Sequence, residues 1–158
     1  MSTPATPYRQ LILAEVLARL QTIRRPNGFE TDAGRYVLIG EIAIGPDDAD
    51  EAIAMVPGET SPLSDRTIGK VAEVLPIGIA ALARVRSYTE YARAWMRAEA
   101  ILADIKQALE IADRTYGGLI QNDLRRGPTV TLERPEGGDT LGIGITYEAW
   151  YHTGWGIR

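Results

Sequence analysis

The chain has 158 residues, 45% hydrophobic and 24% charged, a composition typical of a globular domain that buries its core without disulfides or metals. Its formal net charge of −4 argues against a general nucleic-acid binder, and the absence of cysteine excludes disulfides, thiolate chemistry and cysteine-ligated metals. There is no signal-peptide pattern at the start and no apolar run of the roughly 18 residues that cross a bilayer, so we expect a soluble, cytoplasmic product with no membrane partner.

The first expected element is a helix over residues 7–23, with Thr6 as its N-cap and Pro7 in the first helical position. It must end before Arg25-Pro26, because the residue before a proline disfavours the helical conformation, and Asn27-Gly28 then predicts a turn. The apolar residues recur at helical spacing, and those expected to be buried are Leu13, Val16, Leu17, Leu20 and Ile23.

Two strands and a loop are expected next. Residues 36–44 are dense in Val, Leu and Ile and predict a strand, closed by residues 45–48; residues 52–56 predict a shorter one that ends at Pro57-Gly58. Residues 58–68 are polar and rich in turn formers, so we expect an exposed, mobile loop that becomes ordered against a partner. The contact residues we expect in this loop are Glu59, Ser61, Leu63, Asp65 and Arg66.

A long extended segment is expected over residues 70–86. Pro76 and Gly78 interrupt it, which fits an edge or bulged strand better than a regular central strand. Residues 71–82 are apolar on both faces, with Val71, Leu75, Ile77 and Ile79 on one and Ala72, Val74, Ala80 and Leu82 on the other. Two explanations remain open: helices cover one face and a partner the other, or both faces are buried inside the subunit.

A second helix and a closing hairpin complete the chain. The helix is expected over residues 90–112, with a buried stripe formed by Trp95, Ala98, Leu102, Ile105, Leu109 and Ala112. The hairpin is expected to pair residues 128–134 with residues 141–152. Alternation along the last strand turns Leu141, Ile143, Ile145 and Tyr147 towards the core, and Gly142, Gly144, Thr146, Glu148 and Trp150 away from it.

No residue pattern in the chain predicts a catalytic, cofactor or metal site. His152 is the only histidine, so we expect a surface or interface residue and neither a His-His zinc site nor a Ser-His-Asp triad. The remaining candidates have ordinary structural explanations: a solvated acidic turn (Asp47, Asp48, Asp50, Glu51), solvated basic pairs (Arg24-Arg25, Arg125-Arg126), hairpin-turn carboxylates (Glu133, Glu136), and glycines that permit close approach of another group (Gly142, Gly144).

The order of elements resembles the tail terminator, or tail completion, proteins of long-tailed bacteriophages and prophages. The features that carry the resemblance are soft turns and hydrophobic patterns spread over nearly the whole chain. They are the opening helix 11–23, the turn 27–29, the strand end 55–59, the long strand 70–86, the helix 98–106, the Arg114-Thr115-Tyr116-Gly117-Gly118-Leu119 break and the Gly137-Gly138-Asp139 hairpin.

This resemblance implies a single, non-enzymatic α+β domain over residues 1–158, with residues 1–6 as a flexible tail. Its mainly antiparallel or mixed sheet would carry two helices on one face. Such proteins form a ring, typically hexameric, on the last disc of the tail tube, at the head-proximal end of the virion tail. The ring stops tube growth and receives the head completion or connector protein, and DNA passes through its lumen without specific binding.

Two other functions remain open. A neck, head–tail connector or minor tail protein of the same fold is a close competitor, and a small enzyme is motivated only by the carboxylates and His152. For a ring protein made in the cytoplasm of a bacterial host, we expect the subunit or partner interface to include Val74, Ala80, Leu82, Trp150, Tyr151 and Trp155.

Overall fold

A computed structural model of the protein describes residues 6–45, 49–62, 70–121, 123–132 and 138–154. Six strands form one mixed sheet in the order β1-β2-β4-β6-β5, with β3 also paired to β4. β1 runs parallel to β2 and the other pairs are antiparallel. The strands are β1 (Val37–Ile39), β2 (Glu51–Pro57), β3 (Ser61–Pro62), β4 (Lys70–Arg84), β5 (Arg125–Leu132) and β6 (Thr140–Gly154). The expected α+β class is confirmed.

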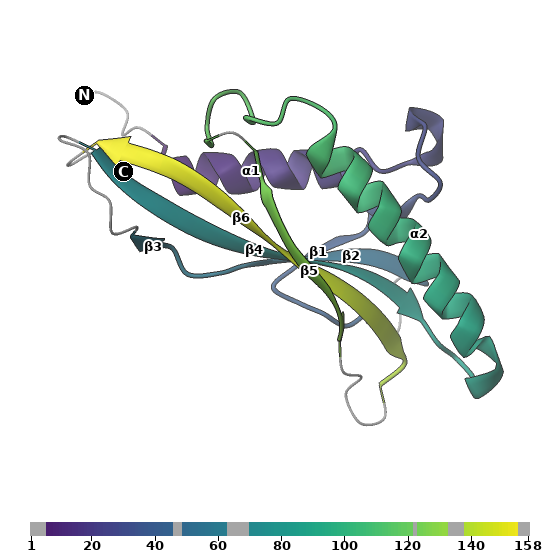
Figure 1. The fold of residues 1–158 in the computed structure, drawn as a ribbon. Helices are drawn as coiled ribbons and strands as arrows, with labels where there is room; N and C mark the ends of the chain where they lie inside the picture. The colour runs from purple at the N-terminus through teal and green to yellow at the C-terminus, as the bar shows by residue number, and fades with distance from the viewer. Residues whose placement is uncertain (1–5, 46–48, 63–69, 122, 133–137, 155–158) are drawn as a thin grey trace.

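Helices α1 (Tyr8–Gln21) and α2 (Tyr91–Glu110) lie on the same side of this sheet, which we call the helix-covered face (Figure 1). The main core fills the space between them. It includes Ile12, Val16 and Leu20 of α1, Ala98, Ile101 and Ile105 of α2, and Leu75, Ile77, Ile79, Ile143, Ile145 and Tyr147 of the sheet. The opposite side of the sheet, which we call the open face, has no helix over it in the part of the chain that the structure describes.

Helix α1 begins one residue later than expected. Its N-cap is Pro7, in an extended conformation with no side-chain capping hydrogen bond, so the assignment of Thr6 as the cap is wrong. The buried stripe also differs, because Ile12, Val16 and Leu20 are fully buried while Leu13 and Leu17 flank them and are only partly covered. The predicted turn after the helix is confirmed, with Gly28 in the left-handed region at φ +91°.

The first strand is much shorter than residues 36–44. β1 covers only Val37–Ile39, and Gly40 then adopts φ +78°, which most side chains avoid and which ends the extended run. The chain nevertheless returns to the sheet, because Ile44 is buried on the open face at 5% exposure. The apolar composition of residues 36–44 therefore predicted a longer strand than the one that forms.

The expectation that the long strand lies at an edge is wrong, because β4 runs between β2 and β6. Pro76 is tolerated there for a local reason. Its carbonyl oxygen accepts a hydrogen bond from the Gly58 nitrogen at 2.8 Å, so its backbone polar groups face the β2 side, just where β2 ends at Pro57. The missing N–H of Pro76 therefore removes no hydrogen bond from the ladder with β6.

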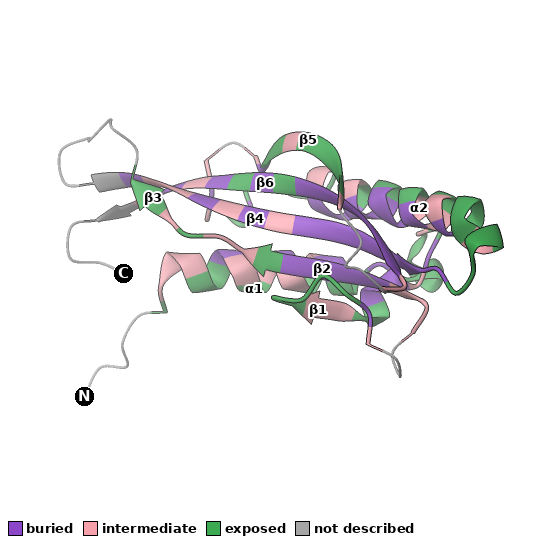
Figure 2. Cartoon of the chain, turned by 90° about the horizontal axis from the view of Figure 1, so that it is seen from below, coloured by how far each residue is buried: buried purple, intermediate pink, exposed green. Residues whose placement is uncertain are grey.

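The second half of the chain follows the predictions closely. Helix α2 lies within two residues of the expected ends and is preceded by a short 3₁₀ turn, η3 (Tyr88–Glu90). Most of its expected stripe is buried, but Trp95 is only partly buried and Ala112 is exposed beyond the end of the helix. The alternation of β6 is confirmed, because Leu141, Ile143, Ile145 and Tyr147 belong to the main core and Thr146 and Glu148 are exposed. Figure 2 shows this alternation of buried and exposed positions along the strands. Residues 133–137 of the hairpin turn lie outside the described part.

The loop expected over residues 58–68 is described only in its first part. Ser61 and Pro62 form β3, which pairs with Val74 and Glu73 of β4. Glu59, Ser61 and Pro62 are exposed. Leu63, Asp65 and Arg66 lie outside the described residues, so the predicted mobility of the loop stays a prediction.

Candidate interaction surfaces

The open face of the sheet carries a second, smaller apolar cluster. It consists of Ile44, Ala52, Ala54, Ala80 and Leu82, with Leu38 and Leu132 packed against them. Leu82 is fully buried and Ala80 is 5% exposed, so both faces of β4 are buried within the subunit at this end. Of the interface residues predicted here, Ala80 lies at the floor of a surface hollow, whereas Leu82 offers no surface in the isolated subunit.

Beside this cluster the open face forms a shallow apolar hollow of about 240 Å³. Its floor includes Gly78, Ala80 and Gly144, whose small or absent side chains leave a depression in the sheet. Its rim is formed by Ile42, Val56 and Val130, which are 50%, 37% and 50% exposed. Apolar side chains that meet around one depression, with no helix above them, are typical of a contact surface.

Leu132 at the edge of the hollow explains the two glycines of β6. A Cβ atom on Gly142 would lie 2.9 Å from Leu132 Cδ1, and one on Gly144 would lie 3.5 Å from Leu132 Cδ2. The prediction that these glycines permit close approach of another group is therefore confirmed. The group is a leucine side chain of the neighbouring strand β5, which folds over the glycines and closes one side of the hollow.

Trp150 and Tyr151, both expected at an interface, point to opposite faces. Trp150 lies on the open face and is paired with Val74 of β4. Both side chains are partly exposed. Tyr151 is 3% exposed and belongs to the main core, so in the isolated subunit it offers no surface to a partner. Burial, together with a hydrogen bond to Glu73, raises the pKa of its phenol to about 12. Trp155 lies outside the described residues.

Arg125 is not simply solvated, as the sequence suggested. Its guanidinium lies 3.5 Å from the centre of the Trp150 ring, and the Trp150 indole nitrogen donates to Glu148 Oε2 at 3.1 Å. The pairing of β5 with β6 produces this arrangement, because Arg125 lies directly opposite Glu148. The separation of these residues in the sequence concealed the contact.

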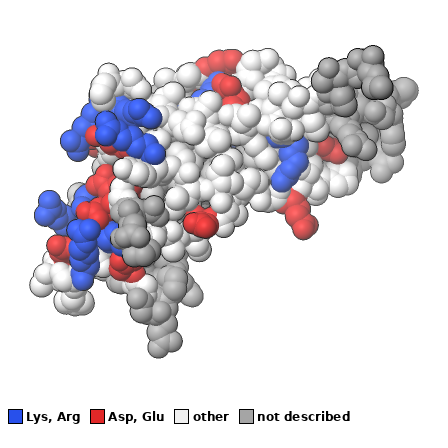
Figure 3. Space-filling model, turned by 180° about the vertical axis from the view of Figure 1, so that it is seen from behind, with Lys and Arg blue, Asp and Glu red and all other residues white. Residues whose placement is uncertain are grey.

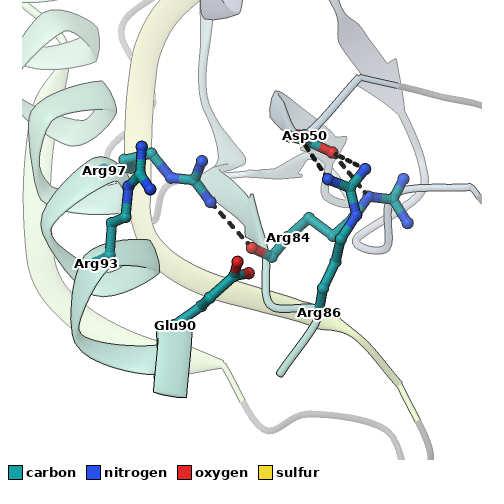
Figure 4. A pocket seen from close by; sticks show the side chains of 6 residues that line it. All are labelled: Asp50, Arg84, Arg86, Glu90, Arg93 and Arg97. Atoms are coloured by element: carbon teal, nitrogen blue, oxygen red, sulfur yellow. Dashed lines mark hydrogen bonds and ion pairs between the residues drawn. The ribbon is translucent and has the colours of Figure 1, made fainter. Parts of the chain in front are cut away.

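A second hollow, of about 230 Å³, is lined entirely by charged side chains, and we call it the arginine hollow (Figure 4). The residues that line it are Asp50, Arg84, Arg86, Glu90, Arg93 and Arg97. They come from the segment before β2, the end of β4 and the residues after it, the end of η3, and the first turns of α2. Figure 4 shows Arg93 and Arg97 on α2, across the hollow from Arg86 and Asp50.

Arg84 fastens several segments together beneath this hollow. Its side chain is only 6% exposed and lies 2.7 Å from Asp139 Oδ2 and 3.3 Å from Asp50 Oδ1. It also donates a hydrogen bond to the Gly45 carbonyl. A buried guanidinium that meets two carboxylates and a carbonyl satisfies most of its donors, which makes Arg84 a structural residue.

The other arginines are more accessible. Arg86 is 65% exposed and binds both oxygens of Asp50, at 2.7 and 3.2 Å. Arg97 donates to the Arg84 carbonyl at 3.1 Å, and its Nε lies 3.7 Å from Glu51. Asp50 and Glu51 are therefore ion-paired and not the solvated acidic turn that we expected, because β2 places them beside the end of β4. Asp47 and Asp48 lie outside the described residues.

The remaining described residues form no further cluster of reactive or metal-binding side chains. No group of three or more His, Asp or Glu side chains among them is placed to hold a metal ion. His152 is partly buried against the Gln121 side chain, whose nitrogen contacts the imidazole ring. No helix in the described part is long and apolar enough to span a membrane.

No model of a known protein family matches the chain, and no curated protein matches its sequence. Among solved structures, it is similar to a chain of the virion of the native gene transfer agent particle, with 21% identity, a TM-score of 0.46, and coverage of 93% of this chain and 92% of that one. It is also similar to the sheath/tube terminator, in the extended state, of the PVC extracellular contractile injection system. There the identity is 11% and the TM-score 0.40, and the match covers 97% of this chain and 59% of the other. Both TM-scores are low, and neither likeness says what this chain does.

Proposed function

We propose that the protein is a structural component of a phage or phage-like virion that forms a ring on the end of the tail tube. The ring stops tube growth and presents a surface for joining to the head. The resemblance of the sequence to tail terminator proteins, over nearly its whole length, supports this function. In it the partners are further copies of the chain, the tube protein, and a head completion or connector protein.

The single observation that carries the proposal is the apolar hollow on the open face. Both helices pack on the opposite face, so the hollow keeps Ile42, Val56 and Val130 exposed to between 37% and 50%. A small-molecule site usually encloses its ligand and directs several polar groups at it. Here the lining is strand backbone, glycine and aliphatic side chains, with Thr146 as the polar residue among them. Such a surface suits contact with another protein.

Cryo-electron microscopy of the assembled particle tests the proposal. We expect several copies of the chain in a closed ring at the tube end that faces the head. Particles made without the protein should have tubes of uncontrolled length that lack heads. A single copy per particle, or a position away from that end, would overturn the terminator function.

A neck, connector or minor tail protein of the same fold is the second candidate, because the same open face would serve its contacts. In that case the ring lies on the head side of a separate terminator, and tails lacking the protein keep their normal length. The enzyme alternative rests on His152, and His152→Ala separates it from both structural functions. Loss of biological activity in that variant, with the fold preserved, would favour an enzyme.

A further inference from the structure

We propose that the arginine hollow is the positive half of a contact between neighbouring copies of the chain, and that carboxylates of the second copy enter it. This inference rests on the proposed function, since it assumes a ring of identical subunits. A ring needs two different surfaces on every subunit, because each copy meets its neighbours head to tail. The arginine hollow supplies one such surface.

The distribution of charge favours a second copy as the occupant. The hollow is lined by four arginines and two carboxylates, and Asp139 and Glu51 beside it are ion-paired with Arg84 and Arg97, so Arg93 is the arginine left without an ion pair among the described residues. The whole chain carries a net charge of −4. Figure 3 shows basic and acidic side chains gathered together at one end of that view, with fewer charges over the rest. An arginine without an ion pair, on a molecule whose net charge is negative, can be met by a carboxylate of an identical molecule.

Arg93 is the arginine of the hollow with donors to spare. Asp50 serves both Arg84 and Arg86, and Arg93 has no ion pair with any residue that the structure describes. Arg93 and Arg97 are also four residues apart on α2, a spacing at which like charges repel. A carboxylate from outside would reduce this repulsion, and a guanidinium fork binds a carboxylate through two parallel hydrogen bonds.

Exposed apolar side chains on the segment that supplies part of the hollow suit a protein partner. Tyr88 is 94% exposed and Met96 is 69% exposed, and both belong to η3 and the first turns of α2, the same segment that supplies Glu90, Arg93 and Arg97. Aromatic residues, Met and Arg are enriched in the centres of protein interfaces. The start of α2 and η3 therefore offer a partner both apolar surface that can be buried and charged side chains that can form ion pairs.

A DNA phosphate is a poorer occupant than a protein carboxylate. Binding to the DNA backbone uses an extended basic stripe that follows successive phosphates. Here Asp50 and Glu90 are interleaved with the four arginines around one hollow. These two carboxylates interrupt the positive surface that successive phosphates would need, whereas a single partner carboxylate needs only one guanidinium, such as that of Arg93.

Charge reversal in the assembled particle tests the inference. Arg93→Glu removes no intramolecular ion pair within the described residues, so the variant should unfold at the wild-type temperature. We expect its incorporation into particles to fall at least tenfold. The matched control is Arg114→Glu, an exposed arginine beyond the other end of α2, which should assemble like the wild type. Normal incorporation of a folded Arg93→Glu variant would overturn the inference.

A photo-crosslinking residue at Tyr88 identifies the occupant directly. In particles we expect a covalent dimer of this chain whose linked peptide from the second copy contains Asp or Glu. The same residue at Ile111, exposed beyond the C-terminal end of α2, is the control. Crosslinks to the tube protein, to DNA or to no partner would each overturn the inference. They would leave the proposed function intact if a ring of the protein is still seen at the tube end.

Discussion

Gly34 occupies a position in which no side chain fits. It belongs to the short turn η2 (Ala33–Arg35), and its nitrogen donates to the Ile23 carbonyl at 2.9 Å. A Cβ atom here would lie 2.4 Å from the Leu20 oxygen and 2.7 Å from the Ile23 oxygen. Because these neighbours are backbone atoms at the end of α1, they can move only if the helix end moves.

We therefore expect Gly34→Ala to lower the free energy of unfolding by about 3 kcal/mol, through overpacking. Urea unfolding followed by circular dichroism measures it. Gly78→Ala is the matched control, since its new Cβ would lie 3.4 Å from the nearest atom, the Val56 oxygen, and should change stability by less than about 1 kcal/mol. Equal effects from the two variants would show that the contact between η2 and α1 is looser than described.

Asp113 organises the turn that follows α2. It accepts hydrogen bonds from the Thr115 hydroxyl at 2.8 Å, the Thr115 nitrogen at 3.1 Å and the Gly117 nitrogen at 2.7 Å. These bonds, led by the one from the Thr115 hydroxyl, hold the pKa of Asp113 below its ordinary value. A folded-state pKa below the unfolded value means that ionised Asp113 stabilises the fold above the unfolded pKa of about 3.9. That contribution is lost as the pH falls through the folded pKa.

Asp113→Asn should therefore destabilise the protein at neutral pH, and the difference from the wild type should shrink on acidification. Unfolding midpoints in urea at about pH 7 and about pH 3 provide the comparison. A difference that is the same at both pH values would mean that the charge of Asp113 contributes nothing, and that only the shape of the turn matters.

At the scale of elements, the register of β6 decides which side chains meet the helices. Ile145 is 1% exposed in the main core, whereas its neighbour Thr146 is exposed on the open face. Ile145→Asp would bury an unpaired carboxylate and should cost about 4 kcal/mol or more. Thr146→Asp should cost less than about 1 kcal/mol. Thermal unfolding of both variants checks this, and equal losses would contradict the register.

The sequence predicts the structure correctly where a local period determines it. The alternation from Leu141 to Tyr147 and the helical spacing in α2 each depend on near neighbours, so side-chain polarity alone reports which way they face. Strand ends and strand order were not predicted, because they depend on backbone conformation and on pairing with distant strands. β1 ends at Gly40 because of a backbone conformation, and β4 is central because β2 and β6 pair with its two sides, with Pro76 tolerated where β2 ends. Neither feature can be predicted from the hydrophobicity of the sequence.

The candidate surfaces were predictable to different extents. The small and apolar residues on the second face of β4 pointed to the open face, although Leu82 proved to be covered by Ile44, Leu38 and Leu132. The arginine hollow was missed, because it combines Asp50, the end of β4 and the start of α2, which only the tertiary fold brings together. The spacing of Arg84 with Arg86, and of Arg93 with Arg97, was the only local signal.

At the scale of the whole molecule, the acidic charge suits a conduit for DNA. If the proposed ring holds six copies, as the sequence resemblance implies, six charges of −4 give −24. The net negative charge of such a ring would repel the phosphates of DNA that passes through it. The arginine hollow is compatible with this, since carboxylates of the neighbouring copy would neutralise it in the assembly.

Assembly through the open face can be tested with two adjacent positions of β5. Val130 pairs with Gly144 and forms part of the rim of the apolar hollow, whereas Thr129 pairs with Ile145 and faces the other way. Both side chains are exposed, so a glutamate at either position should change the free energy of unfolding by less than about 0.5 kcal/mol. The two variants therefore differ in the face that receives the charge and not in stability.

We expect Val130→Glu to abolish capping of the tail tube, because the charge would be desolvated when a partner covers the hollow. Thr129→Glu should cap tubes normally. The measurement is the distribution of tail lengths and the fraction of headed particles in electron micrographs, after each variant replaces the wild-type protein. If Val130→Glu yields normal particles, the hollow stays exposed in the assembly and the ring must use other surfaces. If both variants fail while remaining folded, the contact includes both faces of β5, and the edge strand itself would then be the element that meets the partner.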